Sequence, residues 1–230
     1  MNEQHYEAER LIPDIVIRRL PIYARSLRHL LHSGIATVSS DELAERIGVT
    51  AAQIRRDLSY FGRFGKQGKG YDVATLIDEI HGILNLDRRW DIALVGFGHL
   101  GRAIADYPGF AASSFRIVAI FDRSPDLIGA KNAFGVPVQP QTELVSTVQK
   151  LGIKVGIVAV PAATAQDVAN DLIAGGVGAI LNYAPVTLRV PDEIRVRDID
   201  PISALQSMTY YLDNNKTEPD SEWSHAANGS

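Results

Sequence analysis

The residues with the clearest chemical potential form a glycine-rich segment whose spacing suits the pyrophosphate of a dinucleotide: Gly96, Phe97, Gly98, His99, Leu100 and Gly101. In such a segment the first glycine makes a tight turn and the second lets the pyrophosphate approach the backbone. The third allows a helix to pack closely on a strand. The apolar run Ile92–Val95 just before it predicts a strand buried on both faces, and we expect a helix over 102–107. Free N–H groups at a helix N-terminus favour the negative charge of phosphates.

A carboxylate stands where a dinucleotide site needs one. The predicted strand 116–121 ends at Asp122, which lies 21 residues after Gly101 and could accept hydrogen bonds from the ribose hydroxyls of the adenosine. A carboxylate at this point repels a 2′-phosphate, so NADH and NAD⁺ are favoured over NADPH and NADP⁺. Arg123 beside it weakens that preference. The alternative is a β-α-β turn that serves the fold alone.

The rest of this half alternates between helix and strand. Helices are predicted over 142–150 and 164–174, and strands over 155–160, 179–181 and 194–196. This alternation is typical of an α/β fold, a Rossmann-type doubly wound parallel sheet. Because such sheets bind ligands at the carboxyl ends of their strands, the nicotinamide half is expected near Val160, Pro161 and Asn182.

The N-terminal third predicts a winged helix-turn-helix. Helices are expected over 13–19 and 21–32, followed by two capped helices that begin near Ser40 and Ala51 and by a helix over 72–84. The glycine- and lysine-rich segment 62–71 is expected to form a β-hairpin wing, and the alternative is a solvated glycine loop. The linker is placed over 85–91.

The second capped helix, expected over 51–61, has one apolar and one polar face, so it is the candidate recognition helix. Arginine on such a helix can grip guanine O6 and N7 together. The expected DNA contacts of the helix are Ala51, Gln53, Arg55, Arg56, Ser59 and Tyr60. Lys66 and Lys69 in the wing are expected to contact phosphates.

The charge distribution agrees with this division. The 230 residues carry a net charge of −4, yet the segment 15–71 has a net charge of +6, which suits a polyanion such as double-stranded DNA. The absence of cysteine excludes disulfides, thiolate-bound zinc and thiol switches. There is no metal-ligand cluster and no apolar run long enough to cross a membrane, so a cytoplasmic protein that binds neither metal nor membrane is expected.

Dinucleotide binding without turnover is the favoured interpretation. The sequence has no Tyr-x-x-x-Lys pair and no second domain that could shape a substrate pocket, and His99 is the one histidine within the nucleotide-binding part. No catalytic residue is assigned. Two alternatives remain: an NAD-dependent reductase with an accessory domain, and a repressor whose second domain serves dimerisation or binds another nucleotide.

From about Ile12 to Leu212 the chain resembles the Rex family of redox-sensing transcriptional repressors. Besides the glycine-rich segment, the resemblance rests on five segments: Arg19-Leu20-Pro21, Ile54-Arg55-Arg56-Asp57-Leu58-Ser59-Tyr60-Phe61-Gly62, Gly68-Lys69-Gly70-Tyr71, Val160-Pro161-Ala162, and Asn182-Tyr183-Ala184-Pro185. The resemblance implies that NAD⁺ favours binding to an inverted-repeat operator and that NADH releases it.

The resemblance further implies a homodimer that exchanges a C-terminal helix. A coupling network would join Arg19, Tyr107 and Asp200. The expected domains are a DNA-binding domain over 1–85, a nucleotide-binding domain over 86–198, a swapped helix over 199–213 and a disordered tail over 214–230.

Overall fold

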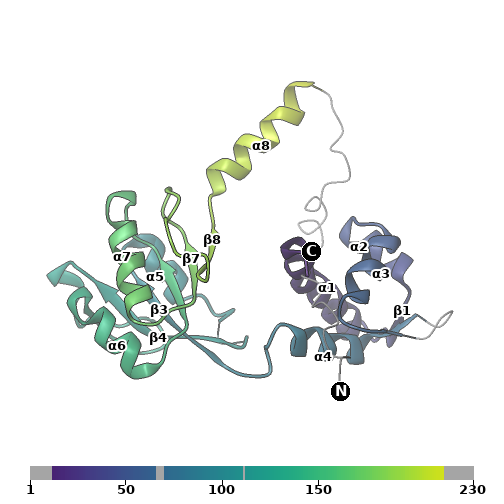
Figure 1. The fold of residues 1–230 in the computed structure, drawn as a ribbon, viewed down its shortest axis with the longest axis horizontal. Coiled ribbons are helices and arrows are strands. Elements are labelled where there is room, and N and C mark those ends of the chain that lie inside the picture. The colour runs from purple at the N-terminus through teal and green to yellow at the C-terminus, as the bar shows by residue number, and fades with distance from the viewer. Residues whose placement is uncertain (1–11, 66–69, 111, 215–230) are drawn as a thin grey trace, which may run out of the picture. The chain divides into compact units, whose positions relative to one another are not determined.

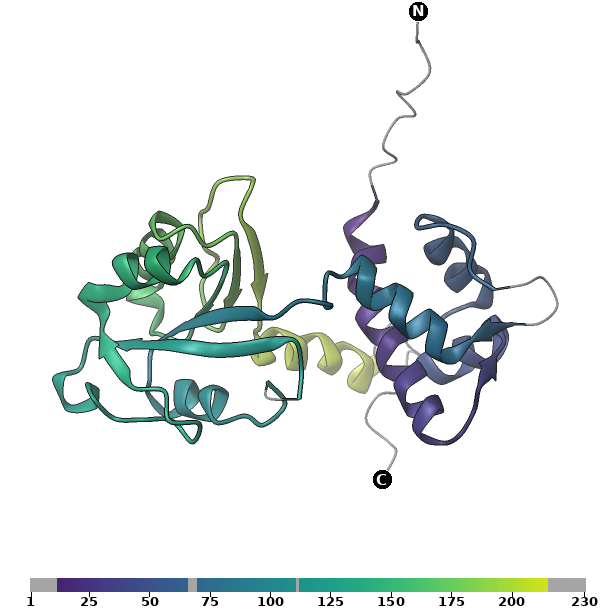
Figure 2. The same cartoon turned by 90° about the horizontal axis from the view of Figure 1, so that it is seen from below.

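The computed structural model describes residues 12–65, 70–110 and 112–214. These residues divide into two compact units, and the boundary falls between Asp87 and Arg88. Figures 1 and 2 show the two units from two directions. Each unit has a core of its own and is described by itself.

The first unit contains four helices and one pair of short strands among its described residues. The helices are α1 (Asp14–His32), α2 (Ser40–Ile47), α3 (Ala51–Ser59) and α4 (Val73–Ile83), and the strands are β1 (Thr37–Val38) and β2 (Tyr71–Asp72). One apolar cluster joins all of these helices, with Leu27 of α1, Leu43 of α2, Ile54 of α3 and Ile80 of α4 fully buried. The helix-turn-helix pair α2–α3 is therefore fixed on a rigid base.

Side-chain caps define where three of these helices begin. Ser39 and Glu42 form the reciprocal capping box expected at α2, and Asp72 accepts a hydrogen bond from Thr75 N (2.8 Å) at α4. At α3, Thr50 accepts from Gln53 N (3.2 Å), as predicted. The Gln53 side chain, however, turns towards Arg19 instead of back to Thr50, so the second capping box is only half formed.

One local expectation for the first unit is wrong. The predicted helices 13–19 and 21–32 are a single helix, because α1 continues through Pro21, and an apolar face on both sides of the proline packs on the core. The hairpin wing expected over 62–71 is only partly described and stays a prediction: β2 pairs antiparallel with β1, with Val38 opposite Tyr71, and the described residues 62–65 are not assigned to a strand. Residues 66–69 lie outside the described part of the chain.

The second unit has a six-stranded parallel sheet with the order β5-β4-β3-β6-β7-β8. Its strands are β3 (Trp90–Val95), β4 (Phe115–Asp122), β5 (Val138–Pro140), β6 (Val155–Val158), β7 (Ala179–Asn182) and β8 (Arg195–Asp198). Counted from the first strand of this unit, the order is 3-2-1-4-5-6, which is that of a doubly wound dinucleotide-binding fold. The order reverses between β3 and β6, where such folds bind their ligand.

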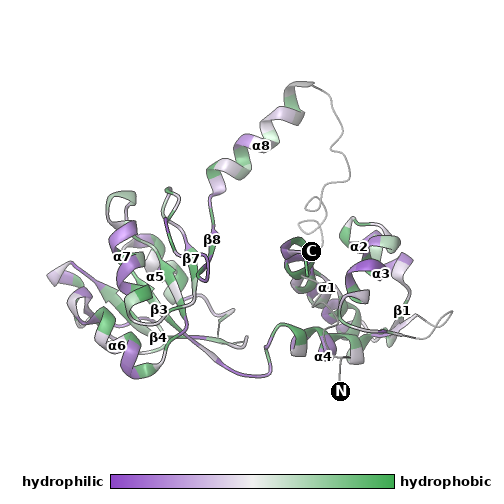
Figure 3. Ribbon diagram, viewed as in Figure 1, coloured by the Kyte–Doolittle hydropathy of each residue, from purple (hydrophilic) through white to green (hydrophobic). Residues whose placement is uncertain are grey.

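Helices cover both faces of this sheet (Figure 1). The side chains of β3 alternate: Ile92 and Leu94 pack with α5 (His99–Ala105), whereas Ala93 and Val95 pack with α6 (Leu144–Leu151) and α7 (Ala162–Ala174). Burial on both faces explains the continuous apolar runs of the central strands. Figure 3 shows these strands as apolar segments.

The expected boundaries in the second unit need several corrections. β3 begins at Trp90, inside the expected linker, because Trp90 N donates to Ser114 O (2.7 Å) and Asp91 pairs with Arg116 of β4 (2.9 Å). α5 begins at His99 rather than Arg102, so the third glycine lies within the helix. The short edge strand β5 was not anticipated, since three residues of partly exposed chain carry almost no periodic signal.

The last described element is helix α8 (Pro201–Asn214). Asp200 caps it, accepting from Ile202 N (2.9 Å) and Ser203 N (3.3 Å). Every α8 side chain whose exposure is described is exposed, including Leu205 (57%) and Leu212 (79%). Within the described residues, no helix is long and apolar enough to span a bilayer.

Candidate functional site

The glycine-rich loop lies between the ends of β3 and β6, at the reversal of the strand order. Gly96 has φ +96°, and a Cβ there would lie 2.3 Å from the carbonyl oxygen of Ala159, which follows β6. A Cβ on Gly101 would lie 1.8 Å from Gly96 O. Both glycines are therefore required by the fold, and Gly101 brings the first turn of α5 against the loop.

Gly98 differs from both of these neighbours. Its φ of −69° suits any residue, and a Cβ built on it would meet no heavy atom within 4 Å. Neither the backbone conformation nor the packing of the chain requires glycine here. The open space lies at the N-terminus of α5, where no side chain caps the helix. This cradle of free N–H groups fits a pyrophosphate.

Asp122 lies at the carboxyl end of β4 and contacts the glycine-rich loop. Its Oδ2 accepts a hydrogen bond from Phe97 N (2.6 Å), and its Oδ1 accepts from Ser124 N (2.8 Å). Each carboxylate oxygen keeps a lone pair for a ribose hydroxyl. The Phe97 side chain is buried (2% exposed), so only its backbone could face a ligand, whereas Arg123 is exposed.

Arg102 was not assigned to the cofactor site from the sequence, because it was counted only as part of the helix expected over 102–107. Its Nε donates to Phe97 O (3.3 Å), and its guanidinium lies 5.0 Å from the centre of the Phe97 ring. A positive charge is thereby held beside the glycine-rich loop. The two other loop residues assigned to the cofactor, His99 and Leu100, are exposed on the first turn of α5.

The loop after β6 supplies a second helix start at the same edge of the sheet. Helix α7 follows Pro161, and no side chain caps its N-terminus. Val160 is half-buried and Pro161 is exposed, so both have surface available at the expected nicotinamide end.

Asn182 braces the loop after β7. The side chain is fully buried, and its Nδ2 donates to Val186 O and Asp198 Oδ1, both at 2.8 Å, while its Oδ1 accepts from Ala184 N (3.0 Å). These contacts join β7 to β8 and fix the loop that follows β7. The contact of Asn182 with the nicotinamide stays a prediction.

The expected DNA-binding face of α3 is open in the first unit. Ala52, Arg55, Arg56 and Ser59 are exposed, whereas Gln53 and Tyr60 are half-buried. Arg55 is oriented by α2, since its Nη1 donates to Ser40 Oγ (2.6 Å). Ala51 is half-buried at the start of the helix. The expected wing contacts Lys66 and Lys69 lie outside the described residues.

A buried ion pair joins α1 to α3. Arg19 (5% exposed) donates to both oxygens of Asp57 (2% exposed), with Nε–Oδ2 at 2.6 Å and Nη2–Oδ1 at 2.9 Å. Tyr23 Oη also donates to Asp57 Oδ2 (2.6 Å). In the sequence alone, Asp57 is only one of the acids within the basic segment 15–71. The four-residue spacing of Arg19 and Tyr23 was the available signal for this cluster.

The three residues of the expected coupling network have different surroundings. The guanidinium of Arg19 donates to Asp57 of α3, so a change at Arg19 would affect α3. Tyr107 is 59% exposed and packs edge-on against Phe110, with ring centres 5.9 Å apart. Asp200 is exposed, and its contacts are those of the α8 cap. A network between these residues stays a prediction.

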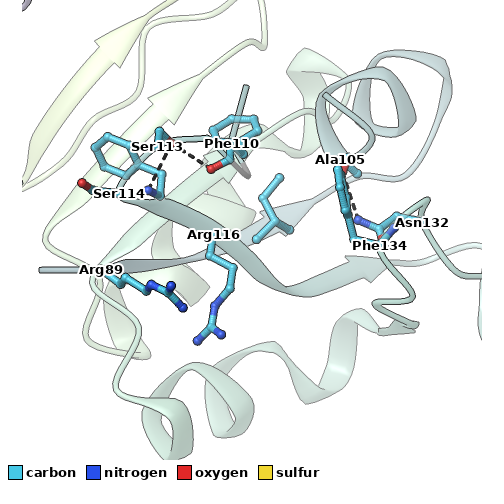
Figure 4. Close-up of a pocket in the computed structure, with 10 residues that line it drawn as sticks. Arg89, Ala105, Phe110, Ser113, Ser114, Arg116, Asn132 and Phe134 are labelled. Carbon is cyan, nitrogen blue, oxygen red and sulfur yellow. Dashed lines mark hydrogen bonds between the residues drawn. The ribbon is translucent and has the colours of Figure 1, made fainter. Parts of the chain in front are cut away.

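A separate pocket of about 280 Å³ lies at the amino ends of β3 and β4, at the opposite end of β3 from the glycine-rich loop (Figure 4). Phe110, Phe115, Ile117 and Phe134 give it an apolar wall, and Arg89 and Arg116 also line it. It shares no residue with the candidate nucleotide site. Among the described residues, no group of three His, Asp or Glu side chains could hold a metal ion.

Comparisons with known proteins agree with this division of the chain. Residues 11–59 match a family described as "Putative DNA-binding protein N-terminus", and residues 87–186 match one described as "CoA binding domain". A redox-sensing transcriptional repressor Rex from Roseiflexus sp. is 56% identical over 200 residues, which cover 87% of this chain and 90% of the relative. The Rex of Streptomyces coelicolor is 43% identical, covering 87% of this chain and 77% of that protein.

Solved structures give the same result. The Rex-family repressor RSP in complex with NAD⁺ and operator DNA has a TM-score of 0.84 and 38% identity, covering 89% of this chain and 94% of that one. RSP in complex with NADH has a TM-score of 0.81 and 36% identity, covering 89% and 96%.

Proposed function

Because this chain belongs to the Rex family of redox-sensing transcriptional repressors, we propose that it carries NADH/NAD⁺ sensing and operator binding on one polypeptide. Its nucleotide-binding unit places a glycine-rich loop at the reversal of the sheet order, and its DNA-binding unit exposes a basic helix. Its relatives are repressors and not enzymes, so the nucleotide is a ligand that is bound and released without turnover.

One observation carries the nucleotide site. Gly96 and Gly101 are glycines because backbone atoms crowd them, whereas no atom of the described residues lies within 4 Å of a Cβ built on Gly98. Asp122 accepts a hydrogen bond from Phe97 N in the glycine-rich loop, and its carboxylate oxygens have further lone pairs for the hydroxyls of a ribose. Gly98 would bring the pyrophosphate to the free N–H groups of α5, and Val160 and Pro161 would border the nicotinamide.

The switch requires two conformations with different affinities for the two nucleotides. NAD⁺ and NADH differ by one positive charge and by the planarity of the nicotinamide ring. A ligand shifts an equilibrium only by its difference in affinity for the two states. In this protein NAD⁺ goes with the operator-bound state and NADH with the released state, as the two RSP complexes suggest for that relative.

The finer assignments are part of the proposal. An inverted-repeat operator calls for two copies of α3, and α8 supports a homodimer because its apolar residues Ile202, Leu205, Met208 and Leu212 are exposed on this chain. Exchange of α8 between subunits would bury them. The domain limits stay as expected from the sequence, at 1–85, 86–198, 199–213 and 214–230, and the protein acts in the cytoplasm without a metal.

Two rival functions predict different results. A reductase would oxidise NADH steadily in the presence of a small carbonyl compound. A repressor that uses another nucleotide, such as coenzyme A, would prefer that ligand in calorimetry, and the "CoA binding domain" match makes this ligand the one to compare.

The deciding experiment is a gel shift on a duplex library with randomised inverted repeats, at fixed salt, titrated with NAD⁺, NADH or coenzyme A. We expect NADH to weaken retention more than NAD⁺ at equal concentration, with coenzyme A inert. Equal effects of NADH and NAD⁺ would contradict redox sensing.

A further inference from the structure

The guanidinium of Arg19 contacts a second side chain on α3 besides Asp57. The side-chain amide of Gln53 lies beside it, with the amide oxygen 3.0 Å from Nη1 and 3.2 Å from Nη2 when this oxygen faces Arg19. The opposite orientation would set the NH₂ group of Gln53 against guanidinium donors, which is repulsive. The oxygen therefore faces Arg19.

Helix geometry explains why one arginine reaches both side chains. Gln53 and Asp57 are four residues apart on α3, so they lie on the same side of the helix. Asp57 is 2% exposed and fixes the guanidinium through two hydrogen bonds. Gln53 lies one turn closer to the N-terminus of α3 and is half-buried, on the flank of the exposed Arg56 face.

The contact restricts what Gln53 can offer to DNA. A glutamine that reads adenine uses its amide oxygen and its amide nitrogen together, on N6 and N7. Here the oxygen is committed to Arg19, so the NH₂ group alone is left for the DNA. Two donors suit bases whose major-groove edge presents acceptors and no amino donor, which are guanine (O6 and N7) and thymine (O4). Adenine is disfavoured because its acceptor N7 lies beside the N6 amino donor.

We propose that Arg19 is a positioning residue that makes Gln53 a donor-only reader, so that one operator position in each half-site is restricted to guanine or thymine. This inference rests on the proposed function, because it requires α3 to enter the major groove. Arg19 thereby influences which base is selected, although its own side chain is too buried to touch DNA.

The test is selection and sequencing of the same randomised inverted-repeat library with the full-length protein in NAD⁺. The wild type should enrich one base pair at one Gln53-dependent position per half-site, and the strand that carries its guanine or thymine is then the strand followed in the variants. Gln53→Ala should reduce this enrichment at least fivefold while leaving the other positions unchanged. Arg19→Lys keeps a charge for Asp57 but loses the planar fork that holds the amide, so it should lose the same preference, and adding Gln53→Ala should change nothing further.

A second variant leaves Arg19 in place and therefore does not depend on tolerance of a buried substitution. Gln53→Glu keeps an oxygen towards Arg19 and replaces the outward donor by an acceptor, so the preference should move to cytosine or adenine, which present amino donors. Exposed Arg28→Lys is the matched control for Arg19→Lys and should leave the profile intact.

The outcomes separate the two proposals. If the wild type enriches no sequence at all, DNA reading by this protein is contradicted together with the inference. If the wild type enriches a sequence and the Gln53→Glu profile matches it, only the inference is overturned. A uniform loss of affinity in Gln53→Ala, without a change of base preference, would indicate a phosphate contact and would also overturn it.

Discussion

Asp122 at the end of β4 and Phe97 in the glycine-rich loop are joined by a 2.6 Å hydrogen bond from the backbone N–H of Phe97 to the carboxylate. The residue expected to bind the ribose therefore also fixes the loop expected to bind the pyrophosphate. The ribose and pyrophosphate parts of the candidate dinucleotide site are therefore linked, and a substitution of Asp122 should weaken nucleotide contacts in both parts.

Asp122→Ala should weaken NADH binding at least tenfold, because a hydrogen bond to a charged group contributes roughly 1.5–3 kcal/mol and both ribose and loop contacts are lost. Calorimetry measures the affinity. Operator binding without nucleotide should be unchanged. The matched control is Asp126→Ala, an exposed acid four residues later. Equal affinities of the two variants would argue against the assigned site.

Gly98 and Gly101 of the loop should respond differently to alanine. Gly98→Ala should fold with an unchanged melting temperature and lose NADH affinity, because its methyl group enters open space kept for the pyrophosphate. Gly101→Ala should destabilise the second unit, since its Cβ would meet Gly96 O. Gly178→Ala, also in open space but outside the cleft, should change neither property. Full NADH affinity in Gly98→Ala would contradict the cradle.

Arg56→Ala should lower operator affinity by about 1–3 kcal/mol and relax one base preference, because an exposed arginine on α3 is suited to a guanine. Fluorescence anisotropy at fixed salt measures the loss. Arg189→Ala removes the same charge from the second unit and serves as the control. A similar loss in both variants would show that net charge alone, rather than a base contact, is responsible.

Tyr23→Phe tests the buried cluster through its pH dependence. Burial, and then the hydrogen bond to Asp57, raise the pKa of Tyr23 above its usual value of 10.0. The unfolded chain therefore loses this proton above pH 10 while the folded chain keeps it, so the contribution is fully present below pH 10 and is lost at higher pH. Urea unfolding of the wild type should show stability falling above pH 10, and Tyr23→Phe should show a smaller slope. Tyr107→Phe, at an exposed site, should keep the slope of the wild type.

Leu205→Asp should weaken dimerisation at least tenfold without unfolding the second unit, because Leu205 is 57% exposed on this chain and belongs to the apolar stripe of α8. Sedimentation velocity measures the association. Ser207→Asp adds the same charge on the opposite side of the helix and is the control. A dimer of normal affinity in Leu205→Asp would exclude α8 from the interface.

The sequence alone determined those structural features that depend on residues close together in the chain. Caps at Ser39 and Thr50 placed helix starts, and the apolar run before Gly96 placed the central strand together with the loop and Asp122. These features depend on neighbouring residues, whose spacing directly reflects helix and strand geometry. The resemblance to the Rex family also rests on short segments of consecutive residues.

The tertiary structure decided which distant segments meet. The pairing of β2 with β1, the edge strand β5, and the burial of Asp57 against Arg19 depend on partners far away in the chain. No periodicity in the sequence encodes such a partner. From the sequence alone, Asp57 is expected at the surface and the side-chain amide of Gln53 is expected to be available to DNA. Only the tertiary structure places the guanidinium of Arg19 against both side chains.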